Sequence, residues 1–254
     1  MSNAPLSLDE VSRYARHLVL PEVGGPGQQK LKAASVLVIG AGGLGAPVLM
    51  YLASAGVGRL GIVDHDHVSL SNLQRQIIHT TENVGKAKVE SAAETLNAIN
   101  PHPVLELHNE RLEIGNAEAL ISKYDIVVDG SDNFETRFLV ADTCERLEKT
   151  LVTGAVNRFD GSITTLQPFA IGKDGKQNPR YRDLFPNAPS ADTVLTCEEA
   201  GIMGALTGVI GSLQALEVIK AITGVGELLI GQQLLFDASS LLFYPVRYAR
   251  KLVD

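Results

Sequence analysis

The residues best suited to chemistry in this sequence begin with a glycine-rich segment. The stretch GAGGLG, residues 40–45, satisfies the pattern G-x-G-x-x-G. It follows a short β-branched run at 36–39 and opens a helical run, so its backbone N–H groups are free to approach a phosphate or a ribose closely. The segment therefore predicts a nucleotide site that uses the four glycines Gly40, Gly42, Gly43 and Gly45.

Two acids stand where strand-like runs end. Asp64 closes the run 60–64, at about the 20-residue distance at which a dinucleotide site places an acid for the ribose. Asp132 comes just after the run 126–129, where a carboxylate oxygen is placed to hold Mg²⁺. The other interpretation of Asp132 is structural, because an Asp–Asn pair at this point also caps a helix that begins at 134.

Cationic and amide side chains separate two kinds of nucleotide enzyme. Asn72 and Arg75 follow the second strand-like run, and Lys88 lies near the start of a helical segment. The pyrophosphate of a dinucleotide needs only the helix terminus, whereas a triphosphate also needs cations and a divalent metal. An NAD-linked oxidoreductase remains an alternative, but it leaves Arg75, Lys88 and Asp132 without a joint purpose. The sequence lacks G-x-x-x-x-G-K-[ST], so it does not support a P-loop NTPase.

The elements that position these residues alternate along the chain. The early order βαβαβ predicts an α/β fold with a doubly wound, Rossmann-like and mostly parallel sheet. Later hairpin-like runs predict antiparallel strands near the C-terminal end. We expect strands at 36–39, 60–64, 104–108, 126–129, 151–154, 162–166, 233–237 and 241–246, and helices at 86–99, 134–148 and 198–222.

We expect a single domain over residues 1–254. N-terminal helices over 7–33 open on a capping box formed by Ser7 and Glu10. Spacing alone assigns Arg16, in the first of these helices, to a solvated basic edge. A polar, proline-bearing loop over 172–196 is long enough to predict either a functional role or disorder.

Composition limits the partners and the compartment. The formal net charge is −7, which gives no general attraction to nucleic acid. The uncharged stretch over 34–58 is cut by its glycines and a proline, and the stretch over 200–216 has helical periodicity, so we expect no membrane span. The first ten residues lack an apolar signal region, which indicates a cytoplasmic protein.

Four motifs together resemble a known family. The segments GAGGLG, DHDHVSLSNLQRQ (64–76), VGKAKVE (84–90) and DGSDNFETR (129–137) are similar to those of the adenylyltransferases that activate ubiquitin-like sulfur-carrier proteins, the bacterial relatives of ubiquitin-activating enzymes. The resemblance is greatest to the molybdopterin-synthase branch, followed by the thiamine-biosynthesis branch. It covers almost the whole chain.

The resemblance implies an activity and a set of roles. The C-terminal glycine of a carrier ending in Gly-Gly attacks the α-phosphate of Mg-ATP and releases pyrophosphate; the carrier is the small subunit of molybdopterin synthase or the thiamine sulfur carrier. A sulfur-donor protein is a further partner. By position, Gly43 lies against the nucleotide, Asp64 holds the ribose, Asn72, Arg75 and Lys88 contact the phosphates, and Asp132 helps to bind Mg²⁺. Arg16 matches an arginine that reaches the triphosphate from the other subunit, which implies a homodimer and replaces the assignment to a solvated edge.

The sequence departs from the family at its cysteines. Many members hold a structural zinc with two C-x-x-C pairs, but Arg180 and Asp183 stand where the first pair would be. Two isolated cysteines cannot complete a thiolate site, so we expect no zinc. Cys197 matches a cysteine that in some branches bonds to the carrier, and a thiol at a helix start is chemically suited to that role. A small buried side chain is the competing interpretation of Cys197, and Cys144 is expected to pack within a helix.

Two further functions stay open at this point. The missing zinc ligands prompt a non-catalytic scaffold that binds a carrier, although every nucleotide residue is intact. Related enzymes that adenylate a tRNA-modification intermediate share the glycine loop, and the acidic pI of about 5.4 disfavours that RNA-directed branch. Adenylation of a sulfur carrier is the leading hypothesis.

Overall fold

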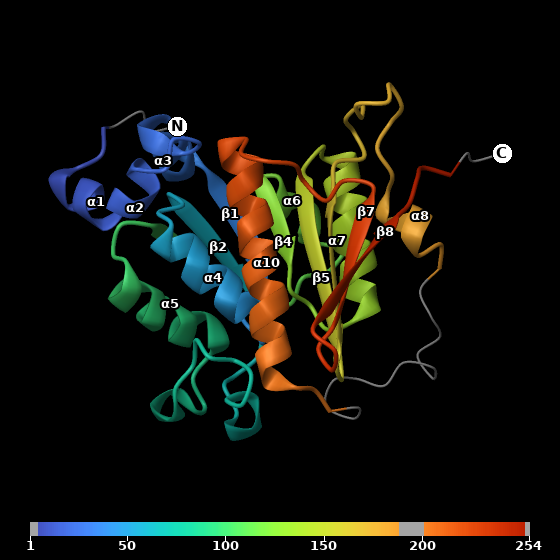
Figure 1. Cartoon of the computed structure of the whole chain (residues 1–254). Helices are drawn as coiled ribbons and strands as arrows, with labels where there is room; N and C mark the ends of the chain where they lie inside the picture. Colours follow the sequence, from blue (N-terminus) through green and yellow to red (C-terminus); the bar gives the residue numbers. More distant parts are fainter. Residues whose placement is uncertain (1–4, 188–200, 252–254) are drawn as a thin grey trace.

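The computed structural model describes residues 5–187 and 201–251, and an eight-stranded sheet forms its centre (Figure 1). The strand order is β3-β2-β1-β4-β5-β6-β7-β8. The first five of these strands pair in parallel and the last three join in antiparallel fashion. The strands are β1 (Ser35–Ile39), β2 (Arg59–Val63), β3 (Val104–His108), β4 (Ile126–Asp129), β5 (Thr150–Asn157), β6 (Asp160–Leu166), β7 (Gln232–Asp237) and β8 (Leu242–Arg247). The predicted doubly wound sheet with antiparallel C-terminal strands is confirmed.

Helices cover both faces of the sheet. Helices α4 (Gly45–Ser54), α5 (Lys88–Ile99) and α10 (Gly204–Thr223) lie on the face nearest the viewer in Figure 1. Helices α6 (Ala117–Ile121) and α7 (Phe134–Arg146) lie behind the sheet. Because consecutive parallel strands are joined through these helices, the carboxyl ends of β1, β2 and β4 meet at one edge, on either side of the point where the strand order reverses.

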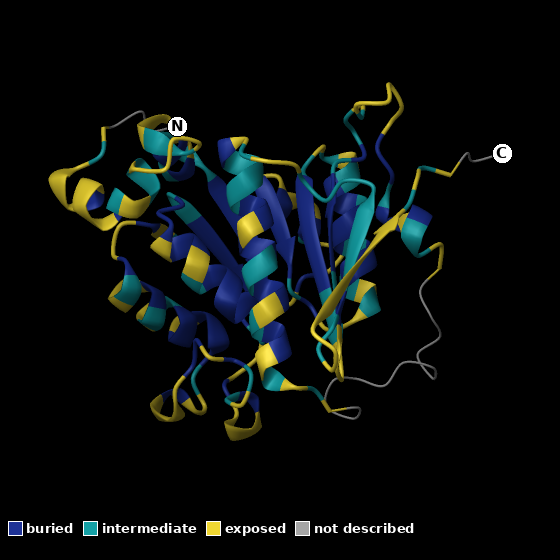
Figure 2. Cartoon of the chain, in the orientation of Figure 1, coloured by how far each residue is buried: buried dark blue, intermediate teal, exposed yellow. Residues whose placement is uncertain are grey.

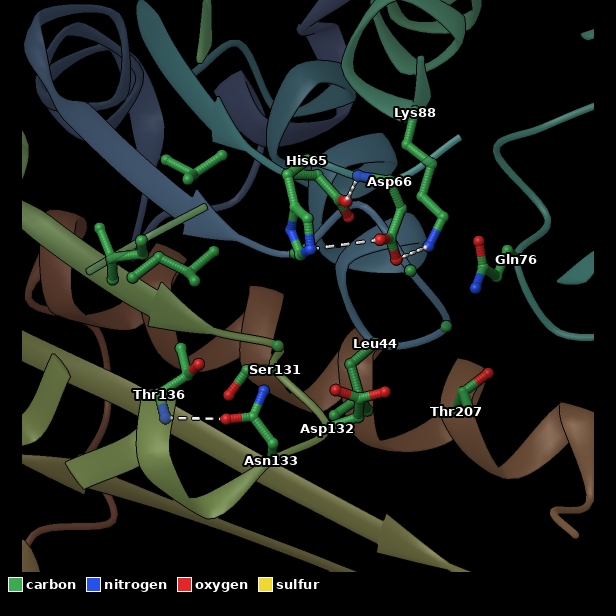
Figure 3. A pocket seen from close by; sticks show the side chains of 18 of the residues that line it. Leu44, His65, Asp66, Gln76, Lys88, Ser131, Asp132, Asn133, Thr136 and Thr207 are labelled. Atoms are coloured by element: carbon green, nitrogen blue, oxygen red, sulfur yellow. Dashed lines mark hydrogen bonds and ion pairs between the residues drawn. The ribbon is translucent and has the colours of Figure 1, made fainter. Parts of the chain in front are cut away.

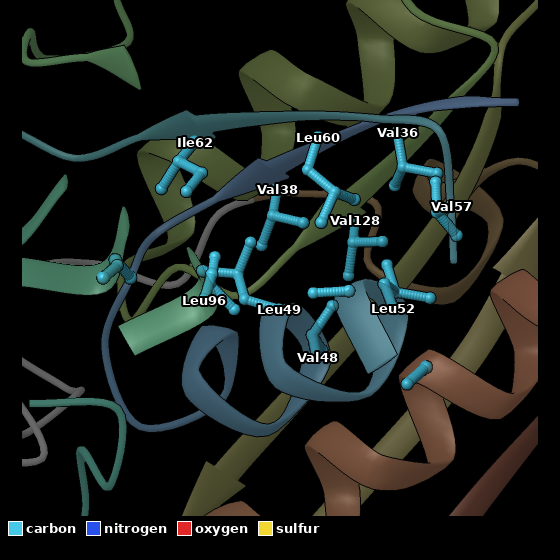
Figure 4. Packing of buried hydrophobic residues seen from close by; sticks show 14 of the residues in the cluster. Val36, Val38, Val48, Leu49, Leu52, Val57, Leu60, Ile62, Leu96 and Val128 are labelled. Carbon is cyan, nitrogen blue, oxygen red and sulfur yellow. The ribbon is translucent and has the colours of Figure 1, made fainter. Parts of the chain in front are cut away.

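The alternation of side chains along the strands divides the core into two layers. On β1, Val36 and Val38 belong to the apolar cluster shared with α4, whereas Leu37 and Ile39 belong to the cluster on the α7 side. Figure 4 shows the first cluster, in which Val38 faces Leu49 of α4 and Val36 lies beside Val57. Every residue of β1 is buried, as expected for a central parallel strand with helices on both faces (Figure 2).

Helix α10 is the one helix of the described residues that is long and apolar enough to cross a bilayer by composition alone. It packs along α4, α3 and the strands β5 and β6, and 44% of its most apolar window is buried. Helix α3 spans Gly24–Ala33. One side of α10 therefore forms part of the core, and its other side carries the exposed apolar residues Val209 and Leu216.

The N-terminal segment begins with the predicted capping box. The backbone N–H of Ser7 donates to Glu10 Oε2 at 2.7 Å, and the backbone N–H of Glu10 donates to Ser7 Oγ at 3.1 Å. Helices α1 (Leu8–Arg13) and α2 (Ala15–Leu18) follow. Tyr14 between them is buried, and its hydroxyl accepts a hydrogen bond from Asn100 at 2.9 Å, which ties this segment to the end of α5.

The sequence placed the element cores well and their ends less well. Strand β4 has the predicted bounds, whereas β5 continues to Asn157 and β6 begins at Asp160, because the two form a hairpin whose pairing extends past the apolar run. Helix α10 begins at Gly204 rather than at 198; residues 198–200 lie outside the described residues. Short elements without a complete period were not predicted: α6, η1 (Leu70–Asn72), η2 (Thr81–Asn83) and α8 (Tyr181–Leu184).

Candidate nucleotide-binding site

A cavity of about 300 Å³ opens at the carboxyl ends of β1, β2 and β4 (Figure 3). Its lining joins the glycine loop after β1, the acids after β2 and the segment after β4. This is the edge at which doubly wound sheets bind their ligands. The predicted site residues that line the cavity are Gly40, Gly42, Gly43, Asp64, Arg75, Lys88 and Asp132.

The glycines of the loop meet different steric demands. Gly40 has φ +91°, a conformation that only glycine adopts without strain. A Cβ on Gly45 would lie 1.8 Å from the carbonyl oxygen of Gly40, so Gly45 permits the close approach of helix α4 to the loop. A Cβ on Gly43 would lie 3.0 Å from Thr207 of α10, whereas one on Gly42 would meet only the Gln76 side chain at 3.6 Å. Gly40 and Gly45 therefore set the shape of the loop, and Gly42 and Gly43 form the wall of the cavity.

Asp64 holds the glycine loop as well as lining the cavity. Its Oδ2 accepts a hydrogen bond from the backbone N–H of Ala41 at 2.8 Å, and its Oδ1 accepts one from the backbone N–H of Asp66 at 2.9 Å. Both bonds come from the backbone, so the carboxylate has a fixed direction. Each oxygen keeps a second lone pair for a ligand hydroxyl.

Lys88 is buried at the first turn of α5 and forms an ion pair. Its Nζ lies 2.8 Å from Asp66 Oδ2, and only 8% of its side chain is exposed (Figure 3). Burial opposes ionisation of Asp66, yet the hydrogen bond and the charge of Lys88 outweigh it and lower the pKa of Asp66. Arg75 is half-buried, and its Nη1 donates to Ser71 O at 3.3 Å. The cavity lining thus includes four cationic side chains, Arg75, Lys88, Arg111 and Arg137, and Lys88 is already paired with Asp66.

The segment after β4 is built around a buried acid. Asp129 accepts hydrogen bonds from Ser131 N at 3.0 Å, from Ser131 Oγ at 2.6 Å and from Thr153 Oγ1 at 2.8 Å. Asn133 caps α7 by accepting from Thr136 N at 2.8 Å. The capping role therefore falls to Asn133, and Asp132 is exposed at the cavity with its carboxylate uninvolved in the cap.

Four predicted site residues are not among the residues that line the cavity. Asn72 is 6% exposed, and its Oδ1 caps η1 by accepting from Ser69 N at 3.4 Å. Gly45 lies beneath the loop, as described above. Arg16 is exposed on α2, away from the cavity lining. The fourth residue, Cys197, lies outside the described residues, and Cys144 is buried within α7 as expected, where burial raises the pKa of its thiol.

The structure adds residues that sequence reasoning missed. Asp66, Gln76, Arg137 and Thr207 also line the cavity. Gln76 is 4% exposed and Arg137 is 9% exposed; the Oε1 of the first and the Nε of the second have no hydrogen-bond partner among the described residues. Arg137 Nη2 donates to Ser131 O at 2.9 Å, which steadies the segment that carries Asp132. The sequence could have indicated Arg137, because it lies in the same DGSDNFETR motif as Asp132.

Asp64, His65 and Asp66 offer ligand atoms within 4.8 Å of one another. A metal would compete here with contacts that the two carboxylates already make. Both oxygens of Asp64 accept backbone hydrogen bonds, and Asp66 Oδ2 is paired with Lys88. The sequence predicts no metal role for His65 or His67, because successive residues at a strand end point to opposite faces, and this stays a prediction.

Arg180 and Asp183 replace the cysteine pair with an ion pair. Asp183 accepts from Arg180 N at 2.7 Å, from Arg180 Nη2 at 2.9 Å and from the backbone N–H of Lys251 at 3.1 Å. The pair therefore fastens the C-terminal segment after β8 to the start of α8. These are the positions at which the sequence resemblance placed the first cysteine pair, and the absence of zinc stays a prediction.

Comparison with known proteins places this chain in a family. The model of the ThiF family matches residues 14–252. The chain is 46% identical over 249 residues to "Adenylyltransferase and sulfurtransferase MOCS3" of Culex quinquefasciatus, covering 98% of this chain and 55% of that protein. It is 48% identical over 230 residues to "Sulfur carrier protein adenylyltransferase" of Thermus thermophilus, covering 91% of this chain and 84% of that protein.

Solved structures share the fold. The structure superposes on the crystal structure of E. coli MccB with ATP with a TM-score of 0.79 at 23% identity, over 95% of this chain and 73% of that chain. The site and the fold define a nucleotide-binding protein of the doubly wound α/β class. The chain belongs to the ThiF family. It spans about half the length of the Culex protein that it matches.

Proposed function

We propose that this chain is an ATP-dependent adenylyltransferase acting on the C-terminal glycine of a ubiquitin-like sulfur-carrier protein. The observation that carries the proposal is the gathering of Arg75, Lys88 and Asp132 in the same cavity as the glycine loop and Asp64. A dinucleotide would leave these charges without a common purpose, whereas a triphosphate uses all of them.

The relatives support this substrate class. The Culex and Thermus proteins are both named as adenylyltransferases, and the Thermus protein is named for a sulfur carrier protein. Members of the ThiF family bind ATP. The particular carrier, of the molybdopterin or the thiamine pathway, is left to experiment, and Cys197 stays a predicted site for a carrier-linked thiol.

The reaction suits the side chains of the cavity. The carrier carboxylate is ionised at pH 7, so it attacks the α-phosphate without a general base, and pyrophosphate leaves with its bonding electrons. The barrier comes from bringing two anions together and aligning them in line. Arg75 and Lys88 offset the phosphate charge, and Lys88 must exchange Asp66 for a phosphate oxygen as the nucleotide binds.

Asp132 would hold Mg²⁺ together with the phosphates. A protein usually binds Mg²⁺ through one or two carboxylates, with water and phosphate oxygens completing the six ligands. An exposed carboxylate at the cavity, outside the helix cap, fits that donor set. When bound, the ion neutralises phosphate charge and holds the triphosphate in one geometry.

Two copies of the chain would complete the site, with Arg16 contributed from the second copy. Val209 is 37% exposed and Leu216 is 51% exposed, and their spacing of seven residues puts them on one stripe of α10. Tyr51, on the neighbouring α4, is 56% exposed. Such an apolar stripe on a helix at the centre of the fold supports a helix-to-helix interface between copies.

The decisive experiment is carrier-dependent exchange between ATP and pyrophosphate, using small proteins that end in Gly-Gly. Asp132→Asn and Arg75→Ala should each lower the exchange rate about 100-fold or more, as expected for loss of one charged contact in a preorganised site. Asp174→Asn, in an exposed turn far from the cavity lining, is the matched control and should leave the rate unchanged. The proposal would be refuted if none of these carriers supported exchange while a nicotinamide cofactor bound tightly.

A further inference from the structure

His79 is buried behind the glycine loop and is not part of the cavity lining. Its Nε2 lies 2.9 Å from the carbonyl oxygen of Ala41, and its Nδ1 lies 2.8 Å from Ser91 Oγ. A carbonyl oxygen only accepts, so Nε2 carries the proton and donates it to Ala41. Nδ1 then accepts from the Ser91 hydroxyl, and the tautomer of the ring is fixed from both sides.

Side chains hold Ala41 at both of its backbone groups. Asp64 accepts from its N–H at 2.8 Å, and His79 donates to its C=O. The carbonyl of Ala41 and the N–H of Gly42 belong to one planar trans peptide, so they point in opposite directions. Because the Ala41 carbonyl is held toward His79, the Gly42 N–H points away from His79. Within residues 5–187 and 201–251, that N–H has no hydrogen-bond partner.

We propose that His79 is a positioning residue that aims the Gly42 N–H at the bound nucleotide. The inference rests on the proposed function, because it assigns His79 to the ATP site of that reaction. Gly42 lines the cavity, and the start of α4 just after it leaves backbone N–H groups for an anion. A rigid peptide aimed in advance avoids the entropic cost of ordering the loop when ATP binds.

Helix α5 supports both the cation and this histidine. Lys88 and Ser91 lie three residues apart on one side of the helix; the first pairs with Asp66 and the second with His79. Thr95, one turn further, donates to the carbonyl of Ile78 at 2.7 Å. Burial lowers the pKa of His79 and the charge of Lys88 acts in the same direction, so the ring is neutral at pH 7 and keeps the assigned tautomer.

Two amide variants separate the contact to Ala41 from the contact to Ser91. The amide nitrogen of glutamine lies as many bonds from Cβ as Nε2 of histidine does, so His79→Gln keeps a donor for Ala41. The amide nitrogen of asparagine lies as far from Cβ as Nδ1, so His79→Asn reaches Ser91 and leaves the Ala41 carbonyl unpaired. Ala41 is fully buried, so water does not replace the lost donor.

The readouts are the Kd for ATP by calorimetry, the KM for ATP and for the carrier in pyrophosphate exchange, and the melting temperature. His79→Asn should raise the Kd and the KM for ATP about tenfold, as expected for one unsatisfied buried carbonyl, and leave the KM for the carrier unchanged. His79→Gln should stay within about twofold of wild type in all three constants.

The results separate this inference from the proposed function. A wild-type protein that does not bind ATP overturns the proposed function itself. If the wild-type protein and both variants bind ATP equally well, only the role of His79 is overturned. The same holds if both variants lose ATP affinity equally and in proportion to their lower melting temperatures. If His79→Asn does not fold, Ser91→Ala removes only the hydroxyl behind the ring: it should raise the KM for ATP about threefold, and an unchanged KM overturns the inference.

Discussion

Replacing Asp183 tests whether its hydrogen bonds hold the C-terminal segment in place. Its side chain is 1% exposed and accepts hydrogen bonds from the backbone and the guanidinium of Arg180 and from the backbone of Lys251. Asp183→Ala removes the carboxylate and leaves two backbone N–H groups and the guanidinium without it. Breaking a buried ion pair costs roughly 3–5 kcal/mol. Arg180 keeps 20% of its side chain exposed and is partly rehydrated, so we expect the lower end, about 3 kcal/mol.

The assay is thermal unfolding followed by circular dichroism, with and without EDTA. For a chain of this size, about 3 kcal/mol lowers the melting temperature by about 6–12 °C. The control is Asp174→Ala, whose carboxylate accepts one backbone hydrogen bond in an exposed turn, and it should change the melting temperature by less than about 2 °C. Wild type should melt at the same temperature in EDTA, and the purified protein should contain no stoichiometric zinc.

The pH dependence has a definite sign. Burial opposes ionisation of Asp183, but its bonds to Arg180 outweigh burial and lower its pKa below the ordinary 3.8. A carboxyl with a lowered pKa in the folded state contributes stability above its unfolded pKa and loses it as the pH falls through the folded pKa. The difference between wild type and Asp183→Ala should therefore be constant from about pH 5 to pH 8 and shrink below about pH 4. Equal melting temperatures for Asp183→Ala and the Asp174→Ala control would refute the reasoning.

Three further predictions concern the cavity and the α10 stripe. Asp66→Asn leaves Lys88 without its carboxylate, so thermal shift should show a lower melting temperature that saturating ATP restores toward wild type; an equal deficit with and without ATP would contradict this. Gly45→Ala, whose Cβ would lie 1.8 Å from a carbonyl oxygen, should lose ATP binding and melt lower, whereas Gly42→Ala should keep the wild-type melting temperature; equal melting of the two would count against the steric argument. Leu216→Glu should give a monomeric mass by light scattering, and a dimer of normal mass would remove α10 from the interface.

The sequence predicted the elements of the fold that have a regular apolar pattern. Strand β4 was predicted to the residue because its apolar, β-branched run ends sharply at Asp129. The acids and Lys88 reached the cavity because strand ends and helix starts meet at one edge of a parallel sheet. Asn72 did not, because its short side chain is used in capping a 3₁₀ turn that has no period to read.

The residues that sequence reasoning missed act through three-dimensional contacts between segments without periodicity. His79 lies between two short 3₁₀ helices, and its partner Ala41 is 38 residues away in the chain. No spacing rule links the two residues, although both lie within quoted or adjoining motif segments. Asp66 follows the end of β2, where no periodicity indicates which way a side chain points. The physical reason is the same in both cases: irregular backbone takes its direction from its hydrogen bonds.

The free protein holds its nucleotide site in a charge-balanced form. The buried ammonium of Lys88 would be costly without a partner, and Asp66, which is 53% exposed, supplies one while remaining able to turn toward water. If a phosphate binds Lys88 as proposed, the released Asp66 carboxylate would be hydrated, so the exchange would cost little. The glycine loop follows the opposite design, because Asp64 and His79 hold it and no exchange is needed. The glycine loop is therefore fixed before a ligand binds. The charge of Lys88 is available to an anion only when that anion replaces Asp66.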